Sequence, residues 1–409
     1  MLTGRRIVLG VTGGIAAYRA AELVRWYVKA GAEVQVVMTD AARQFVTPLT
    51  FQTLSGNPVH YELFNLIQER DIGHIALADR AELLVVAPAT ANLVGKVAGG
   101  LADDLLTTTI LATRAPVLLA PAMNSNMWAN PLYQQNQARL AAAGFHFVDP
   151  VVGLLACGWE GQGKMAEPAT IFEESVRLLS PQDLAGETLL ITAGPTREEL
   201  DPVRFLSNYS SGKMGYAIAR AARRRGARVL LVSGPTALEP PAGVEYCGVT
   251  SAEQMRQAVL ERLAESSVIV KAAAVADYRP ASRAGQKIKK GVGSRTTLEL
   301  EQTPDILAEL GGKKAQRLLV GFAAETEQVL EHARRKLEAK NLDLIVANDV
   351  SAADAGFEVD TNRVTLLYRG GRVEEWLLLD KLAVAHRLLD RIRALRRGEP
   401  LPEPGCAGQ

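Results

Sequence analysis

The sequence predicts an α/β protein made of two doubly wound, Rossmann-like domains. Short apolar runs rich in Val, Ile and Leu alternate with amphipathic helical segments, which is the pattern of a parallel sheet covered by helices on both faces. This alternation occurs twice along 409 residues, a length that suits two or three domains. Hydrophobic residues make up 48% of the chain and charged residues 22%, so each domain can bury a core of ordinary size.

The first half of the chain begins directly with a strand. A helix is predicted over Tyr18–Ala30, and it is followed by Gly31, the residue type that most often ends a helix. The predicted strands of this half are Ile7–Val11, Glu33–Met38, Leu83–Ala87 and Pro116–Ala120.

The second half repeats the pattern and then ends in a β-hairpin extension. Its predicted parallel strands are Thr188–Ala193, Arg228–Val232, Ser267–Ala272, Arg317–Phe322 and Asp343–Ala347. Arg363–Tyr368 and Val373–Leu378 flank Arg369-Gly-Gly-Arg, which predicts the hairpin. A final helix is predicted over Asp380–Arg397, and its basic end is interpreted as a complement to the helix dipole.

The two series are separated by a polar segment that contains both Pro and Gly. This segment, Ser180–Gly186, is the predicted domain break. We therefore expect one domain over residues 1–180 and a second over residues 181–398. Residues 399–409 are rich in Pro and Gly, and we expect them to form a flexible tail.

Charge and cysteine content exclude several classes of function. Lys and Arg total 46 against 45 Asp and Glu, so no basic field is available to hold nucleic acid or an anionic membrane. Three cysteines without a CxxC pair form neither a disulfide framework nor a zinc site. The first residues lack the pattern of a signal peptide, and no apolar run is long enough to cross a bilayer. We expect a cytoplasmic enzyme with small-molecule substrates.

Three predicted strands of the first half are followed by loops suited to a ligand. Gly10-Val-Thr-Gly-Gly lies between the first strand and the first helix, Thr39 follows the second strand, and Ala87–Asn92 follows the third. Glycines let a phosphate approach the backbone and the amides of a helix N-terminus. Taken alone, such a loop serves packing as often as binding, but open α/β sheets bind ligands at this edge. The three loops together favour a phosphate-bearing cofactor, although the glycine spacing is not that of a nicotinamide fingerprint.

The second half contains a segment that is similar to a P-loop but lacks two of its requirements. In Ser210-Ser-Gly-Lys-Met-Gly, the first Gly of the motif is replaced by Ser207 and the Ser/Thr that would bind magnesium by Met214. We therefore reject a P-loop. We instead predict a phosphate site at the start of the helix that follows this segment.

Three side chains of the first half could take part in catalysis or binding, and each also has a purely structural interpretation. His74 precedes a strand, where most lone histidines are surface or hydrogen-bonded residues. Asn124 follows a buried strand and could bind a carboxylate or simply form an Asx turn. Cys157 lies in a glycine-rich segment that could act as a lid, whereas an isolated cysteine is usually an inert small hydrophobe.

Eight short motifs follow one another in a specific order along the two halves. The first-half motifs are Gly73-His-Ile, Ala87-Pro-Ala-Thr-Ala-Asn, Pro121-Ala-Met-Asn-x-x-Met-Trp and Ala156-Cys-Gly. The second-half motifs are Thr192-Ala-Gly-Pro-Thr-Arg-Glu, Ser207-Asn-x-Ser-Ser-Gly-Lys-Met-Gly, Ala272-Ala-Ala-Val-Ala-Asp-Tyr and Lys287-Ile-Lys-Lys. In order and spacing they resemble the motifs of the bifunctional phosphopantothenoylcysteine decarboxylase and phosphopantothenate–cysteine ligase family of coenzyme A biosynthesis. The resemblance runs from about Arg6 to about Leu389.

For the first half, the resemblance implies a flavodoxin-like fold and FMN-dependent decarboxylation. Oxidation of the substrate's CH₂–SH group creates the electron sink that lets CO₂ leave, and the product is then protonated and reduced. The resemblance makes His74 the base-like residue, places Asn124 and Met127 on the substrate, and makes Cys157 the proton donor. The expected FMN contacts are Gly13, Gly14, Ile15, Thr39, Ala87, Pro88, Ala89 and Thr90.

For the second half, the resemblance implies ligation through an acyl-cytidylate, with CTP as co-substrate and Mg²⁺ on the triphosphate. Asn208 would hold and convert the intermediate, and Arg204 would contact the substrate. The expected nucleotide contacts are Lys271, Ala272, Ala273, Asp277, Lys287, Lys289, Pro304, Asp305, Ile306, Leu307, Phe322, Lys336 and Lys340. Without the resemblance, Lys336 and Lys340 indicate only a solvated helix face. No carboxylate cluster identifies metal ligands.

The resemblance also implies homo-oligomers, in which flavoprotein halves form trimers, ligase halves form dimers, and the two together build a dodecamer. Other interpretations fit fewer residues. A peptidyl-cysteine decarboxylase or a flavin prenyltransferase would not need the ligase motifs. A nicotinamide oxidoreductase would need the missing fingerprint. A non-catalytic relative is expected to have lost His74, Asn124 or Cys157, and all three are present.

Overall fold

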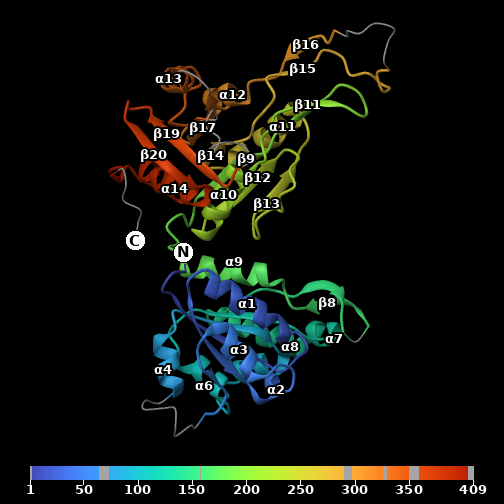
Figure 1. Ribbon diagram of the computed structural model, residues 1–409, viewed down its shortest axis with the longest axis vertical. Coiled ribbons are helices and arrows are strands. Elements are labelled where there is room, and N and C mark those ends of the chain that lie inside the picture. Colours follow the sequence, from blue (N-terminus) through green and yellow to red (C-terminus); the bar gives the residue numbers. More distant parts are fainter. Residues whose placement is uncertain are drawn as a thin grey trace. The chain divides into compact units, whose positions relative to one another are not determined.

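The computed structural model describes residues 2–63, 73–156, 158–289, 297–325, 329–349 and 359–403. The chain divides into two compact units, Met1–Pro181 and Gln182–Gln409, and the boundary lies inside the polar segment noted above (Figure 1). None of the helices in these residues is long and apolar enough to span a membrane.

The first unit is built on a parallel six-stranded sheet with the order β3-β2-β1-β4-β5-β6. Its strands are β1 Arg6–Val11, β2 Glu33–Met38, β3 Val59–His60, β4 Leu83–Ala89, β5 Val117–Pro121 and β6 His146–Phe147. When the two-residue edge strand β3 is set aside, the remaining order is 2-1-3-4-5, that of flavodoxin. All four strands predicted for this half are present, which confirms the α/β prediction.

Helices cover both faces of this sheet. They are α1 Ala17–Lys29, α2 Asp40–Arg43, α3 Pro48–Ser55, α4 Gly73–Arg80, α5 Ala91–Ala98, α6 Leu105–Ala112, α7 Ser125–Ala129, α8 Pro131–Ala142 and α9 Pro168–Leu179. Strand β4 shows why the sequence requires two layers, because all seven of its residues are buried. Leu83 and Val85 join the core on the α1 and α9 side, whereas Leu84 and Val86 join the core that contains α5 and α6. A hairpin follows β6, formed by β7 Val151–Leu154 and β8 Glu160–Lys164.

The second unit contains an eight-stranded sheet with the order β13-β12-β9-β14-β17-β18-β19-β20. The first six strands are parallel and the last two are antiparallel. Its strands are β9 Thr188–Ala193, β12 Arg228–Ser233, β13 Glu245–Gly248, β14 Val268–Lys271, β17 Leu318–Glu325, β18 Leu344–Asp349, β19 Thr361–Tyr368 and β20 Val373–Asp380. The predicted parallel strands and the predicted hairpin are confirmed.

Helices again cover both faces of the sheet, and two short strand pairs lie outside it. The helices are α10 Lys213–Arg224, α11 Ala252–Arg262, α12 Ile306–Lys313, α13 Val329–Ala339 and α14 Lys381–Arg397. The strand pairs are β10 Arg197–Glu199 with β11 Phe205–Ser207, and β15 Tyr278–Pro280 with β16 Leu300–Gln302. Residues of α10 and α14 share one core with the sheet, and residues of α11, α12 and α13 share the other.

The end of the chain differs from the prediction in two respects. Arg391, the first residue of the basic end that is interpreted above as a complement to the helix dipole, is 1% exposed and pairs instead with Glu374 inside the unit. Residues 399–403, expected to be flexible, are held against the same region. Leu401 packs on the core, Arg372 Nη2 donates to the carbonyl of Pro402 at 2.9 Å, and Arg391 Nη2 donates to that of Glu403 at 3.4 Å. Residues 404–409 of the expected tail lie outside the described residues.

Candidate functional site

In the first unit, a single hydroxyl group joins two of the predicted ligand loops. Thr12 is 2% exposed and follows β1. Its Oγ1 donates to the carbonyl of Pro88 at 2.7 Å and accepts from the backbone N–H of Thr90 at 3.1 Å. The third loop joins this arrangement through Thr39, whose N–H donates to the carbonyl of Val11 at 3.1 Å. The carboxyl ends of β1, β2 and β4 are therefore held together, as the sequence predicts.

Glycine is required at one point of this loop cluster. A Cβ atom on Gly13 would lie 2.4 Å from the Cβ of Ala41 and 2.9 Å from its carbonyl oxygen. Helix α1 begins directly after this loop, and no side chain caps its N-terminus. Helices α2 and α5, by contrast, are capped by the Thr39 and Thr90 hydroxyls. A tight loop before an uncapped helix suits a phosphate group. Ile15, another expected contact, is 61% exposed beside it.

The loop that carries Asn124 adjoins the same edge of the sheet. The N–H of Ala122 donates to the carbonyl of Ala89 at 3.1 Å, which links the β5 loop to the β4 loop. The Oδ1 of Asn124 accepts from the N–H of Asn126 at 2.8 Å and so caps α7. This is the Asx arrangement that the sequence left open, and it fixes the direction of the carboxamide. Met127, in the same helix, is 49% exposed.

The remaining two residues expected to take part in decarboxylation are His74 and Cys157. His74 is the second residue of α4, a helix that packs against α6. Its Nδ1 is buried and, in the part of the chain that the structure describes, has no hydrogen-bond partner. Cys157 lies outside the described residues, between β7 and β8. The hairpin on either side of it is attached to the Asn124 loop, because the N–H of Met123 donates to the carbonyl of Gly163 at 3.0 Å.

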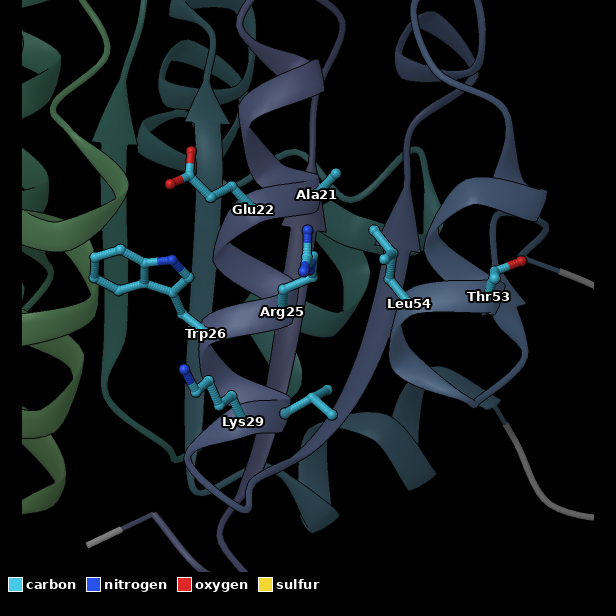
Figure 2. A pocket seen from close by; sticks show the side chains of 8 residues that line it. Ala21, Glu22, Arg25, Trp26, Lys29, Thr53 and Leu54 are labelled. Atoms are coloured by element: carbon cyan, nitrogen blue, oxygen red, sulfur yellow. The ribbon is translucent and has the colours of Figure 1, made fainter.

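A groove of about 890 Å³ lies elsewhere in this unit, on the outer faces of α1 and α3 (Figure 2). Figure 2 shows Glu22, Arg25 and Lys29 along α1, with Leu54 of α3 across from them. Trp26 also lines the groove and packs edge-on against Phe172, with 5.6 Å between the ring centroids. None of the site residues predicted from the sequence lines this groove.

In the second unit, Asn208 is fixed to the end of the central strand. Its Nδ2 donates to the carbonyl of Ala274 at 3.0 Å, and the same carbonyl accepts from the N–H of Thr196 at 3.2 Å. The N–H of Ala273 in turn donates to Thr192 Oγ1 at 3.1 Å. The loops after β9, β11 and β14 are thus joined at one edge of the sheet.

Arg204 precedes β11 and connects the β10–β11 pair to the segment that carries Lys287 and Lys289. Its guanidinium donates to Asp201 Oδ2 and, at 2.8 Å, to the carbonyl of Ile288. The N–H of Ile288 also donates to Asp201 Oδ2, at 3.1 Å. Hydrogen bonds from Arg204 and from backbone amides lower the pKa of Asp201, so this carboxylate stays ionised. Lys287 and Lys289, on either side of Ile288, are exposed.

Two of the expected nucleotide contacts, Asp305 and Lys340, lie close enough to Lys271, at the end of β14, for their charges to act on its amine. Asp305 caps α12 by accepting from the N–H of Ala308 at 3.0 Å, and it pairs with Lys340 at 2.9 Å. Burial raises the pKa of Asp305, but the Ala308 amide and the Lys340 ammonium lower it further, so it falls below its usual range. The N–H of Thr303, just before Pro304, donates to the carbonyl of Asp277 at 3.0 Å.

The remaining expected contacts differ in their surroundings. Lys271 is 6% exposed, and its Nζ contacts Met255 Sδ at 3.8 Å. Ile306 is buried, and Leu307 packs in the same core on the α11–α13 side. Phe322, within β17, packs on the α10–α14 core, on the opposite face of the sheet from Ile306. Lys336 lies on α13, one turn before Lys340.

One polar residue at this edge was not predicted. Asn348, near the end of β18, is 9% exposed, and its Oδ1 has no partner among the described residues. A buried carbonyl oxygen without a donor is costly and commonly marks a position for a ligand or water. The sequence signal was the polar Asn-Asp that follows the apolar run 344–347. The described residues contain no group of three His, Cys, Asp or Glu side chains that could hold a metal ion.

Comparison with known proteins assigns a family to each half. Residues 1–180 match the flavoprotein family, and residues 184–395 match the DNA/pantothenate metabolism flavoprotein C-terminal domain. The chain is 49% identical to the coenzyme A biosynthesis bifunctional protein CoaBC of Bacillus subtilis (strain 168), over 97% of this chain and 98% of that protein. It is 48% identical to the protein of the same name from Escherichia coli (strain K12), over 90% and 92%.

A solved structure of the C-terminal domain of a coenzyme A biosynthesis bifunctional protein CoaBC is also similar. It is 46% identical in sequence, covers 53% of this chain and 100% of its own, and gives a TM-score of 0.46. The two family matches and the near full-length relatives agree with the motifs at both sheet edges. The chain belongs to the family of bifunctional coenzyme A biosynthesis proteins.

Proposed function

We propose that the first unit decarboxylates phosphopantothenoylcysteine with FMN, and that the second unit forms this compound from 4′-phosphopantothenate and cysteine with CTP and Mg²⁺. The observation that carries the proposal is that hydrogen bonds join several family motifs of each unit at the carboxyl ends of its parallel strands. Ligands of open α/β sheets bind at this edge. We assign residues 1–180 to the decarboxylase and residues 181–398 to the ligase.

The loop cluster around Thr12 fits the phosphate end of FMN. The close approach of Gly13 to Ala41 leaves no room for a side chain, and α1 offers uncapped amide groups next to it. We infer that Gly13, Gly14, Ile15, Thr39 and the segment Ala87–Thr90 hold the cofactor. When bound, FMN supplies reversible oxidation of the carbon that bears the substrate thiol.

The protein's own side chains then orient the substrate and move protons. We assign to Asn124 the recognition of the substrate carboxylate, with Met127 beside it in the same helix. The cap on α7 supports this role, because it holds the carboxamide in one orientation. His74 acts as the base, and the lack of a hydrogen-bond partner for its buried Nδ1 within the described part of the chain supports this role. Cys157 donates the proton needed to complete the product.

In the second unit, we assign to Asn208 the stabilisation of the acyl-cytidylate, from which cysteine displaces CMP. Its fixed hydrogen bond to Ala274 supports this role, since a positioned donor stabilises charge without reorganising. Lys287 and Lys289 neutralise phosphate charge, and Arg204 contacts the substrate while it holds their segment in place. The nucleotide lies against the β14 and β17 ends and the start of α12. Mg²⁺ arrives on the triphosphate.

We further propose that the chain forms homo-oligomers with trimeric flavoprotein parts and dimeric ligase parts. The β7–β8 hairpin supports an interface in the first unit, because Val152, Leu154 and Trp159 are 70%, 73% and 52% exposed. Cysteine and CTP are cytoplasmic metabolites, so we place the protein in the cytoplasm.

The test is mass spectrometry of the products formed by the purified protein from 4′-phosphopantothenate, cysteine, CTP and Mg²⁺. Formation of 4′-phosphopantetheine and CMP is the expected result, because it requires both reactions. Accumulation of phosphopantothenoylcysteine would support the ligase alone. Absence of every product, with FMN added and ATP also tried, would contradict the proposal.

A further inference from the structure

We propose that Lys271 is a proton-coupled positioning residue of the ligase unit, whose amine takes up a proton when a nucleoside triphosphate binds beside it. The inference rests on the proposed function, since it requires CTP to bind at the β14 edge. It adds to that function a defined change in protonation.

The fold places Lys271 on one particular face of the sheet. Lys271 is the last residue of β14, and Ile269, two residues earlier, packs in the core on the α11–α13 side. Side chains of a strand alternate between faces, so Lys271 enters the same layer. There it is 6% exposed, and Met255 Sδ, at 3.8 Å, is a weak acceptor. Within the described residues, no carboxylate forms a salt bridge with it.

The charges around Lys271 already neutralise one another. Asp305, at the start of α12, and Lys340, just after α13, pair at 2.9 Å. On the flanking strands, Lys271 is opposite the uncharged Thr192 and Gly321. Burial lowers the pKa of Lys271 to about 7, the charge of Asp305 raises it in part, and that of Lys340 lowers it. A buried amine without a counter-charge is therefore largely neutral at pH 8.

An arriving triphosphate changes this balance. The carboxylate of Asp305 already compensates the charge of Lys340. The Lys271 amine can therefore become the cation that interacts with the anionic nucleotide. The amine then accepts one proton from the buffer and becomes an ammonium group, and no other bond is made or broken. With a pKa of about 7 in the free protein, uptake is about 0.9 proton at pH 8 and about 0.1 at pH 6.

The experiment is isothermal titration calorimetry of the full chain with CTP and Mg²⁺, without phosphopantothenate, so that no turnover occurs. Each titration is repeated in two buffers of different ionisation enthalpy, which gives the number of protons exchanged. Lys271→Met is expected to bind CTP more weakly and without this uptake, and the proton exchange that it still shows measures the contribution of the nucleotide's own phosphates. The matched control is Lys381→Met, because Lys381 is also buried and its pKa is lowered to about 8, but it begins α14 on the other face.

A second measurement on the unaltered protein covers the case in which Lys271→Met fails to fold. The ¹³Cε resonance of Lys271 is expected to titrate near pH 7 in the free protein and to move to its protonated position when CTP is added. Equal proton uptake by wild type and Lys271→Met, or a Lys271 resonance that CTP leaves unchanged, would overturn the inference while the proposed ligase stands. Absence of CTP binding to the wild type would overturn both.

Discussion

Arg391 and Glu374 form an ion pair that is sealed inside the second unit, with 3.2 Å between Nη2 and Oε2 and side chains that are 1% and 0% exposed. Glu374 also accepts from Tyr368 Oη at 3.0 Å and from Trp376 Nε1 at 3.3 Å. Glu374 also pairs with Arg372 at 2.9 Å, whereas Arg391 has no other carboxylate partner among the described residues, so loss of Glu374 leaves a buried guanidinium without compensation. The pair joins the middle of α14 to β20, and thus to the sheet that carries the ligase motifs.

Glu374→Gln is therefore expected to destabilise the second unit by about 3–5 kcal/mol, because the buried Arg391 loses its counter-charge. Denaturant unfolding measures the change. Glu375→Gln is the matched control, since the neighbouring side chain is exposed. Equal stability of the two variants would show that the buried pair contributes little.

Gly13→Ala is expected to weaken FMN binding by about 5- to 150-fold, and so to lower the FMN occupancy of the purified protein, since overpacking of this kind costs about 1–3 kcal/mol. The added Cβ would lie 2.4 Å from that of Ala41, and the loop would have to move away from α2. Flavin absorbance per chain measures the effect. Gly95→Ala is the control, because a Cβ there meets its nearest atom, on Asn136, at 3.8 Å. Full FMN occupancy in Gly13→Ala would remove this loop from the cofactor site.

Cys157→Ser is expected to leave ligation intact and to stall the first unit after CO₂ loss. A serine hydroxyl is a much weaker acid than a thiol, so the final protonation should slow by about 10²–10⁴-fold. Mass spectrometry should then detect the oxidised enethiol product. Normal output of phosphopantetheine would exclude Cys157 from the mechanism.

Asn208→Asp is expected to slow the cytidylate step by on the order of 10²-fold. The substitution replaces the Nδ2 donor with a carboxylate oxygen next to the carbonyl of Ala274, which lies 3.0 Å away. CMP release measures the ligase, and decarboxylation of supplied phosphopantothenoylcysteine is the internal control. Loss of both activities would indicate a folding defect, and full CMP release would contradict the assigned role.

Lys271 also makes the stability of the second unit depend on pH. Its pKa is about 7 in the folded protein, against 10.5 for an ordinary lysine. Between these values the unfolded chain binds more protons, so the free energy of unfolding rises with pH, by at most about 1.4 kcal/mol per unit. Lys271→Met should flatten this rise in denaturant titrations between pH 7 and 9.5. The same slope in both proteins would mean that Lys271 stays charged when folded.

The sheets could be predicted from the sequence because their strands are buried on both faces and therefore form continuous apolar runs. Leu83–Ala89 and Thr188–Ala193 are examples. The short pairs β10–β11 and β15–β16 were not predicted. Each of their strands is three residues long, and several of their side chains are exposed, so neither length nor alternation distinguishes them from loops.

The candidate sites, like the fold, could be predicted from the sequence only in part. The loops at the strand ends could be located because their glycines and polar residues interrupt apolar runs. The partners of those residues could not, since they depend on tertiary packing. The sequence around Thr12 does not show that its hydroxyl forms hydrogen bonds with Pro88 and Thr90. The sequence around Lys271 does not show that its amine contacts Met255, a residue of another element.

The junction between the two units also determines where the halves can be separated. Asp183, two residues after the end of the first unit, accepts from Arg225 Nη2 at 2.6 Å and from Arg393 Nη1 at 2.7 Å. A ligase fragment that starts at Gln182 keeps this carboxylate. A fragment that starts at Glu187 lacks it, so both guanidinium groups lose this anionic partner. Proteolytic or recombinant dissection of the chain should therefore cut before Asp183.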